Sequence, residues 1–111
     1  MGLLKKKMKD IPIKFYSKIC NSLDVFRDLF WDDYRLLGEK IGLSRDEVLL
    51  LGQKMNTTDL MMQKFDSQRN SCIGKLKRIF EEMERGDVLT VINEWIVYEW
   101  RELNSPSALL V

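Results

Sequence analysis

Apolar residues recur at helical spacing along most of this chain, and that periodicity constrains its fold more than any other feature. The i, i+3, i+4, i+7 pattern of a helix that buries one face is followed by Val88, Val91, Ile92 and Trp95. No segment alternates apolar and polar residues long enough to predict a strand. A length of 111 residues provides for one domain. The sequence therefore predicts an all-α fold around one core.

Short breaks divide the chain into six such segments. The apolar positions of the first five are Ile13, Tyr16, Ile19, Cys20 and Leu23; Tyr34, Leu37 and Ile41; Val48, Leu49, Leu50 and Leu51; Leu60, Met61 and Phe65; and Ile73, Leu76, Ile79, Phe80 and Met83. We expect a six-helix antiparallel bundle rather than a coiled coil, because no heptad persists. The core is expected to include Ile19, Leu23, Leu37, Ile41, Leu76, Phe80, Val91 and Trp95. The apolar stretch over residues 26–31 is predicted to bend into the second helix.

Capping signals mark where several of these helices begin and end. Ser44 and Glu47 form a capping box for the third helix, and Gly42 suits the left-handed position after the second. In the triplet Arg85-Gly86-Asp87, glycine is expected to end the fifth helix and aspartate to cap the sixth. The same triplet is an integrin-binding motif, but a break between two helices explains it here.

The residue types needed for most catalytic chemistry are missing. The chain has no histidine, which excludes Ser-His and Cys-His catalysis. Its two cysteines, Cys20 and Cys72, lie 52 positions apart and are expected to be buried thiols in a reducing compartment. The adjacent carboxylates Asp32 and Asp33 diverge by about 100° on a helix, and no glycine-rich phosphate loop is present. We therefore expect no enzymatic activity, no metal and no cofactor.

The net charge of +1 hides an uneven distribution. Residues 1–20 hold six Lys and one Asp, a local +5, whereas residues 81–102 hold seven acids and two Arg, a local −5. The middle of the chain is nearly balanced. Such segregation can steer a basic face toward an acidic face of another molecule. Alternatively, the first and last helices pack together and neutralise each other within one molecule.

Three regions are expected along the chain: a flexible basic arm over 1–11, the folded domain over 12–103 and a flexible tail over 104–111. The start lacks the apolar region of a signal peptide, and no stretch reaches about 18 uncharged apolar residues. We expect a cytoplasmic protein, or the cytoplasmic domain of a receptor. The lysines of the arm are predicted to be solvated, with contact to anionic lipid or nucleic acid as the alternative.

The order of these signals resembles a death domain over residues 12–97. The segment 33–41, Asp-Tyr-Arg-Leu-Leu-Gly-Glu-Lys-Ile, is similar to the second helix of netrin-receptor death domains, usually Asp-Trp-Arg-Leu-Leu-Ala-Gln-Lys-Leu. Residues 18–24 resemble their first helix, and Phe65 stands where the family often has a tryptophan in the fourth. Tyr34 and Phe65 replace two family tryptophans but keep an aromatic ring. Adaptors and kinases of the Toll pathway carry similar domains.

The resemblance implies the death-domain fold, a Greek-key arrangement of six antiparallel helices. It also implies non-enzymatic, homotypic binding to other death-domain proteins in apoptotic or innate-immune signal transduction. Self-association into oligomers belongs to that expectation, and a small-molecule substrate does not. The alternative function is a small helical protein that binds nucleic acid or a membrane surface through its basic arm.

Charged positions opposite the apolar stripes are the candidate contact residues. The predicted protein-interaction residues are Arg35, Glu39, Lys40, Arg45, Asp46, Lys64, Lys75 and Arg78. Asp66 and Arg69 are also expected to be exposed. Arg35 leads because it matches the family motif and because arginine pairs carboxylates with two hydrogen bonds. Beyond the core stripe of the sixth helix, Trp100 is a candidate for an exposed partner contact.

Overall fold

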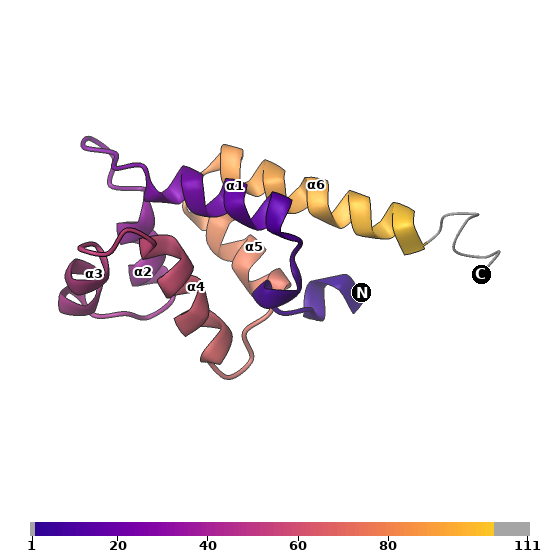
Figure 1. Cartoon of the computed structure of the whole chain (residues 1–111), viewed down its shortest axis with the longest axis horizontal. Coiled ribbons are helices and arrows are strands. Elements are labelled where there is room, and N and C mark those ends of the chain that lie inside the picture. The colour runs from indigo at the N-terminus through magenta and orange to yellow at the C-terminus, as the bar shows by residue number, and fades with distance from the viewer. Residues whose placement is uncertain (1, 104–111) are drawn as a thin grey trace.

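The computed structural model describes residues 2–103 and contains six α-helices, preceded by two 3₁₀ turns (Figure 1). The elements are η1 (Gly2–Lys5), η2 (Met8–Asp10), α1 (Ile13–Asp24), α2 (Tyr34–Lys40), α3 (Arg45–Leu51), α4 (Thr57–Ser67), α5 (Ile73–Glu82) and α6 (Gly86–Leu103). No strand occurs among the described residues. The prediction of an all-α bundle is confirmed. The tail over 104–111 lies outside the described residues.

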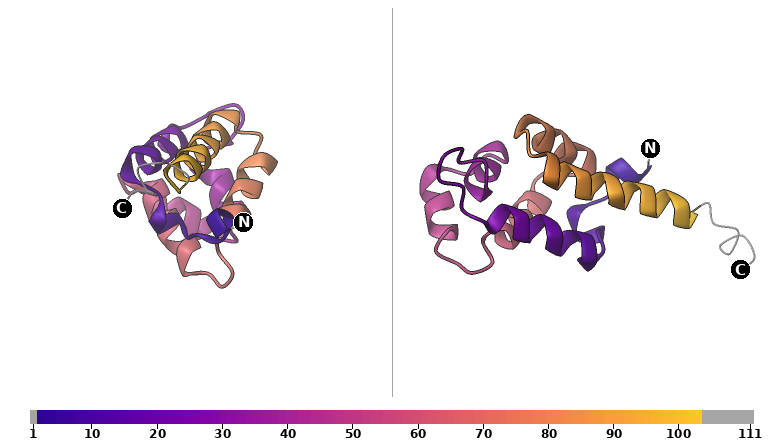
Figure 2. Two further views of the ribbon diagram at one scale, coloured as in Figure 1. Left: turned by 90° about the vertical axis from the view of Figure 1, so that its right-hand side faces the viewer. Right: turned by 90° about the horizontal axis from the view of Figure 1, so that it is seen from above.

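The two terminal helices lie side by side and run in opposite directions (Figures 1 and 2). The Lys6 ammonium lies 3.9 Å from the Glu99 carboxylate, and Lys14 Nζ sits 4.3 Å above the ring of Tyr98. The basic start and the acidic end of the chain therefore meet within one molecule. Both lysine contacts are at the surface, where such pairs contribute at most about 1 kcal/mol.

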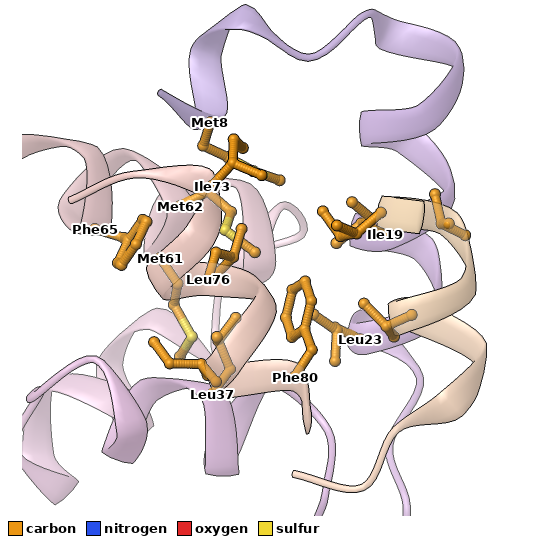
Figure 3. Close-up of a cluster of buried hydrophobic side chains, with 14 of the residues drawn as sticks. Met8, Ile19, Leu23, Leu37, Met61, Met62, Phe65, Ile73, Leu76 and Phe80 are labelled. Carbon is orange, nitrogen blue, oxygen red and sulfur yellow. The ribbon is translucent and has the colours of Figure 1, made fainter. Parts of the chain in front are cut away.

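A single cluster of buried side chains joins the helices (Figure 3). Every residue expected in the core is buried, including Trp95 and Phe80, the largest of them. The expectation for Ile13 is wrong, since its side chain is 81% exposed and Phe15 faces the core in its place. Met62 on α4 and Met8 before α1 are buried without having been expected there. Spacing therefore identified the core stripes but not where the first one starts.

The N-terminal segment is packed against the bundle and is not a free arm. The Met8 side chain is only 1% exposed, and Ile11 is buried beside it. The Asp66 carboxylate of α4 accepts hydrogen bonds from the backbone N–H groups of Met8 and Lys9, at 3.0 and 2.9 Å. The Ile73 amide donates to the Lys6 carbonyl. The folded domain therefore begins before residue 12, and Asp66 is half-buried rather than exposed as expected.

The predicted capping signals hold at the centre of the chain and shift near its end. Ser44 and Glu47 make both hydrogen bonds of the capping box, and Gly42 has a φ of 92°. Gly86, by contrast, does not end α5 but is the first residue of α6. Glu84 adopts the left-handed conformation instead, with a φ of 57°. Asp87 lies in the first turn of α6, where its negative charge interacts favourably with the helix dipole.

Candidate protein-interaction surface

The connection between α1 and α2, residues 25–33, exposes a run of large apolar side chains. We call this segment the aromatic loop. Its exposed members are Val25, Phe26, Leu29, Phe30 and Trp31. Leu29 and Phe30 are 87% and 69% exposed. This stretch bends into the second helix as predicted, through turns that end where α2 begins at Tyr34. The loop projects at the end of the long axis opposite to the last turn of α6 (Figure 1).

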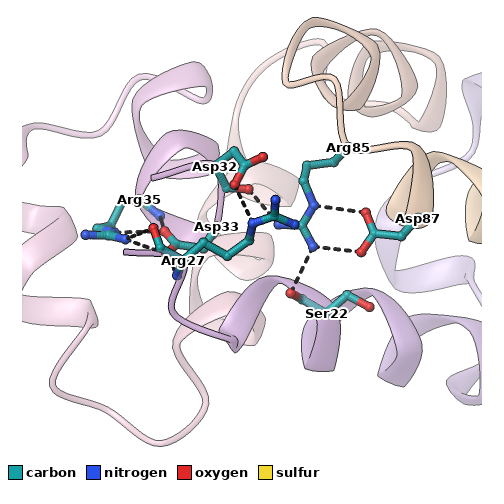
Figure 4. A network of polar contacts seen from close by, with 7 residues as sticks. All are labelled: Ser22, Arg27, Asp32, Asp33, Arg35, Arg85 and Asp87. Carbon is teal, nitrogen blue, oxygen red and sulfur yellow. Dashed lines mark hydrogen bonds and ion pairs between the residues drawn. The ribbon is translucent and has the colours of Figure 1, made fainter. Parts of the chain in front are cut away.

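The buried carboxylate of Asp33 fixes the base of the aromatic loop. Its side chain is 0% exposed and accepts hydrogen bonds from the backbone N–H groups of Arg27 and Arg35, at 2.8 and 3.0 Å. The Arg35 guanidinium adds two more, at 2.9 and 2.7 Å (Figure 4). Burial raises the pKa of Asp33, but these hydrogen bonds outweigh it and hold the pKa below its ordinary value. The charged carboxylate thus ties both ends of the loop together.

Arg35 is the centre of the loop rather than an exposed contact residue. Its side chain is 11% exposed, and the guanidinium carbon lies 3.7 Å from the ring centroid of Phe26 and 3.9 Å from that of Trp31. The guanidinium also donates to the Arg27 carbonyl at 3.0 Å. Hydrogen bonding to Asp33 raises the pKa of Arg35. The expected exposure of Arg35 is therefore wrong, because its charge is used to hold the aromatic rings in place.

A second arginine connects the aromatic loop to α6 and to the end of α1. Arg85 is 4% exposed and donates to both carboxylate oxygens of Asp87, at 2.9 and 2.8 Å. It also donates to the carbonyls of Asp32, at 2.6 Å, and Ser22, at 3.1 Å (Figure 4). Hydrogen bonding from Arg85 lowers the pKa of Asp87. The Arg85-Gly86-Asp87 triplet thus holds the start of α6 against the aromatic loop and α1. Its arginine is buried and is not accessible to an integrin.

The base of the aromatic loop and α3 lie at the same end of the molecule (Figure 1). The ring of Tyr34 lies 6.5 Å from that of Phe26, and a Cβ on Gly52 would lie 3.0 Å from the Tyr34 hydroxyl oxygen. The end of α3 therefore packs against the ring that supports the loop. Exposed apolar side chains of α3 and of the turn after it are Leu49, Leu50 and Met55. We call these three residues and the aromatic loop together the apolar end.

The other predicted contact residues lie exposed on separate helices. Those with exposed side chains are Glu39, Lys40, Arg45, Asp46, Lys64, Lys75 and Arg78. Lys40 Nζ lies 3.4 Å from the Glu82 carboxylate, which links the ends of α2 and α5. Among the described residues, no hydrogen bond or ion pair joins two of these predicted positions. Trp100 is exposed on α6, as expected.

Sequence reasoning missed the aromatic loop as an interaction surface. Residues 26–31 place four apolar side chains within six positions, and Phe26 and Phe30 keep helical spacing with Leu23 and Tyr34, so the sequence pattern did not set this loop apart from the helices. The charged neighbours Arg27 and Asp32 form an ion pair at 2.8 Å, and Arg27 lies 5.6 Å from the Phe30 ring. The contacts that hold the exposed loop are therefore a finding of the structure.

A pocket of about 250 Å³ lies between η2, α1 and α4. Ile11, Ile13 and Met62 line it, together with the hydroxyl of Tyr16, which donates to Asp59. Burial and that hydrogen bond raise the pKa of the Tyr16 hydroxyl. The Asp59 carboxylate also accepts from Asn56 and Gln63, so its oxygens are already paired. Lys9 also lines the pocket, with an exposed side chain, so the carboxylates there are already paired and the remaining charge is at the solvent edge.

Neither nucleophilic nor metal-binding chemistry is assembled in the part of the chain that the structure describes. Cys20 is buried, which raises the pKa of its thiol to about 11, and Cys72 is also a free thiol. No three His, Cys, Asp or Glu side chains between residues 2 and 103 are grouped to hold a metal. None of the helices there has the length and apolar character needed to cross a membrane. No family model, curated protein or solved structure matches this chain.

Proposed function

We propose that this chain is a non-enzymatic protein-interaction module that docks through its aromatic loop. The observation that carries the proposal is the exposure of Leu29, Phe30 and Trp31 above a base whose charges are already paired. Burying apolar surface under a partner contributes a favourable free energy of about 25 cal/mol per Å². Aromatic residues and arginine dominate the binding energy of many protein interfaces. A contact surface of this composition favours a protein partner.

The brace beneath the loop supports binding in a second way. Asp33 and Arg35 connect residue 27 to the start of α2, and Arg85 connects residue 32 to the start of α6. A loop held by these bonds loses little conformational freedom when it docks, so less of the contact energy is lost to ordering.

The partner class follows from the resemblance to death domains. We propose homotypic association with other death-domain proteins, in apoptotic or innate-immune signal transduction and in the cytoplasm. The six-helix, all-α bundle is compatible with this proposal. The segment that most resembles the family, residues 33–41, includes Asp33 and Arg35, which position the aromatic loop. The motif and the candidate surface thus belong to one structural unit.

The alternative function, nucleic-acid or membrane binding through the basic arm, receives less support. Lys7 Nζ donates to the Ser71 hydroxyl at 2.7 Å, and Lys6 lies beside Glu99. Met8 is buried between these lysines and the exposed Lys9. Because these contacts hold the segment on the bundle, its lysines do not form one continuous basic surface.

Binding to a panel of purified death domains from receptors and adaptors tests the proposal. Wild-type protein should bind at least one of them, and Leu29→Asp should weaken binding by about thirtyfold or more, as expected for a central contact. Leu103→Asp is the matched control, since it alters another exposed leucine at the far end of α6. Absence of binding to every death domain, with binding to duplex DNA or anionic vesicles that Lys5→Glu and Lys9→Glu abolish, would establish the alternative.

A further inference from the structure

We infer that the apolar end binds a second copy of this chain in a two-fold symmetric contact centred on Leu29 and Phe30. The inference rests on the proposed function and names the partner of the same surface. It concerns the α1–α2 connection and α3, not the charged helix faces that the sequence singled out. Four features of the structure lead to it: the position of the surface, its internal pairing, its area and its charge.

The apolar end occupies one extremity of an elongated molecule. The aromatic loop and α3 lie together at one end of the long axis, and the last turns of α6 lie at the other (Figures 1 and 2). Two copies can therefore meet through this end without any clash between the rest of their helices. In a two-fold contact both copies use the same patch. Every contact therefore occurs twice, once from each copy.

Charged groups beneath the aromatic loop are bound within the molecule. Asp33 is saturated by Arg27 and Arg35, and Arg27 is also paired with Asp32. Asp28 is the remaining charged side chain of the loop, and it is exposed beside Leu29. A partner therefore needs few polar groups at fixed positions, and mainly needs apolar surface to cover. The apolar end of a second copy provides such a surface.

The area of the loop is suitable for a stable contact. With roughly 200 Å² for each fully exposed large side chain, the exposed fractions of its apolar residues amount to about 650 Å². A standard interface buries about 800 Å² on each partner. Leu49 and Leu50 of α3, both exposed at the same end of the molecule, can supply the remainder. Monomeric proteins rarely expose apolar patches larger than a few hundred Å², and larger ones are typical of contact sites for proteins, membranes or ligands.

The apolar end carries little net charge. Residues 25–35 contain Arg27 and Arg35 against Asp28, Asp32 and Asp33, a net charge of −1. Two copies of so weakly charged a patch repel each other little at physiological salt. Charge therefore does not prevent two copies from meeting through this end.

A head-to-tail contact is the competing geometry. The last turns of α6 expose Val97, Tyr98, Trp100 and Leu103, but Glu99, Arg101 and Glu102 are interspersed among them. An apolar loop pressed onto that surface would have to desolvate those charges, which opposes binding. Head-to-tail contacts also form rings or open filaments, so they would produce species larger than a dimer.

Sedimentation equilibrium on the full chain, from micromolar to near-millimolar concentration, tests the inference. Wild-type protein should reach the mass of a dimer and no higher. Leu29→Asp should weaken the dimer by about thirtyfold or more, and Leu103→Asp should leave it unchanged. Circular dichroism should show the same helix content and melting for both variants, since both leucines are exposed.

Disulfide trapping tests the symmetry. Leu29→Cys, introduced together with Cys72→Ser, places one exposed thiol near the two-fold axis, while Cys20 stays buried. Mild oxidation should then give a covalent dimer in high yield, and the same exchange at Leu103 should not. Mass that grows beyond a dimer and falls with Leu103→Asp would overturn the two-fold contact in favour of head-to-tail assembly.

Failure of this inference is distinguishable from failure of the proposed function. A wild-type protein that is monomeric throughout, yet binds a purified death domain through Leu29, overturns only the self-contact. A dimer that persists in Leu29→Asp but is lost in a Lys75→Glu, Arg78→Glu variant overturns the assignment of the surface and retains homotypic association. A monomer that binds no death domain overturns both.

Discussion

The Arg35 guanidinium donates two hydrogen bonds to the Asp33 carboxylate, at 2.9 and 2.7 Å, while its two faces cover the rings of Phe26 and Trp31. One side chain thereby neutralises a buried charge and orders two exposed aromatic residues. This dual contact explains how a chain can keep a large apolar loop in one conformation in water. Asp33 and Arg35 thus position the loop, whereas Leu29 and Phe30 are its exposed contact residues.

Reversing the charge of Arg35 should unfold the loop and destabilise the domain. Arg35→Glu would leave two carboxylates facing each other at a buried site, and breaking a buried pair costs about 3–5 kcal/mol. Arg35→Lys keeps the charge but loses the paired hydrogen bonds and the stacking on both rings. Its free energy of unfolding should therefore lie between those of wild type and Arg35→Glu. Urea unfolding measures the free energies. Arg45→Glu, at an exposed position on α3, is the control and should unfold like wild type. Equal stability of Arg35→Glu and wild type would contradict the buried pair.

The contribution of Asp33 to stability should disappear in acid. Its hydrogen bonds lower the pKa of the folded state below the value of about 3.9 expected in the unfolded chain. A lowered folded pKa stabilises the protein above the unfolded pKa, and this stability is lost as pH falls toward the folded value. The difference in unfolding free energy between wild type and Asp33→Asn should therefore be constant from pH 7 to about pH 5 and shrink below about pH 4.

Measuring that difference by urea unfolding across pH isolates Asp33 from the other carboxylates, which titrate in both proteins. A difference that stays constant down to the lowest pH at which both proteins fold would show that the Asp33 carboxylate does not titrate with the predicted lowered pKa.

Helical spacing predicted the elements and the core because both depend on residues close in sequence. Ile19, Leu76 and Trp95 are buried where their stripes place them. The aromatic loop was not predicted, and one of its anchors, Arg85, lies 53 positions away in sequence. Arg35 looked like a surface charge because helical spacing does not show how a loop folds its rings over a guanidinium. The first contact is distant in sequence and the second lies within an irregular loop, and periodicity detects neither.

The N-terminal segment should contribute to stability through Met8. Met8→Ala would leave a cavity between the segment and the core and should cost about 2–5 kcal/mol. Met55→Ala removes the same atoms from a side chain that is 100% exposed, and should change stability by less than about 0.5 kcal/mol. Thermal or urea unfolding of both variants gives the comparison. Similar, small effects of the two substitutions would mean that residues 4–11 do not pack as described.

The glycine at position 38 tests how closely α2 packs on its neighbours. A Cβ there would lie 2.6 Å from Val48 Cγ2 and 3.2 Å from Met61 Cε, so α3 and α4 leave no room for a methyl group. Alanine is the residue usual at this position in the resembling family, and it favours a helix over glycine by about 1 kcal/mol. Overpacking costs about 1–3 kcal/mol, so Gly38→Ala should be neutral to destabilising despite the better helix propensity.

Val48→Ala removes the obstructing methyl groups and costs stability on its own. Combined with Gly38→Ala, it should be less destabilising than the sum of the two single changes, because the new methyl group fills the space that valine vacates. A double-mutant cycle in urea measures the coupling, which we expect at about 1–2 kcal/mol. Strict additivity would place Gly38 away from α3, whereas a positive coupling would establish that α2 and α3 are in direct contact beneath the aromatic loop.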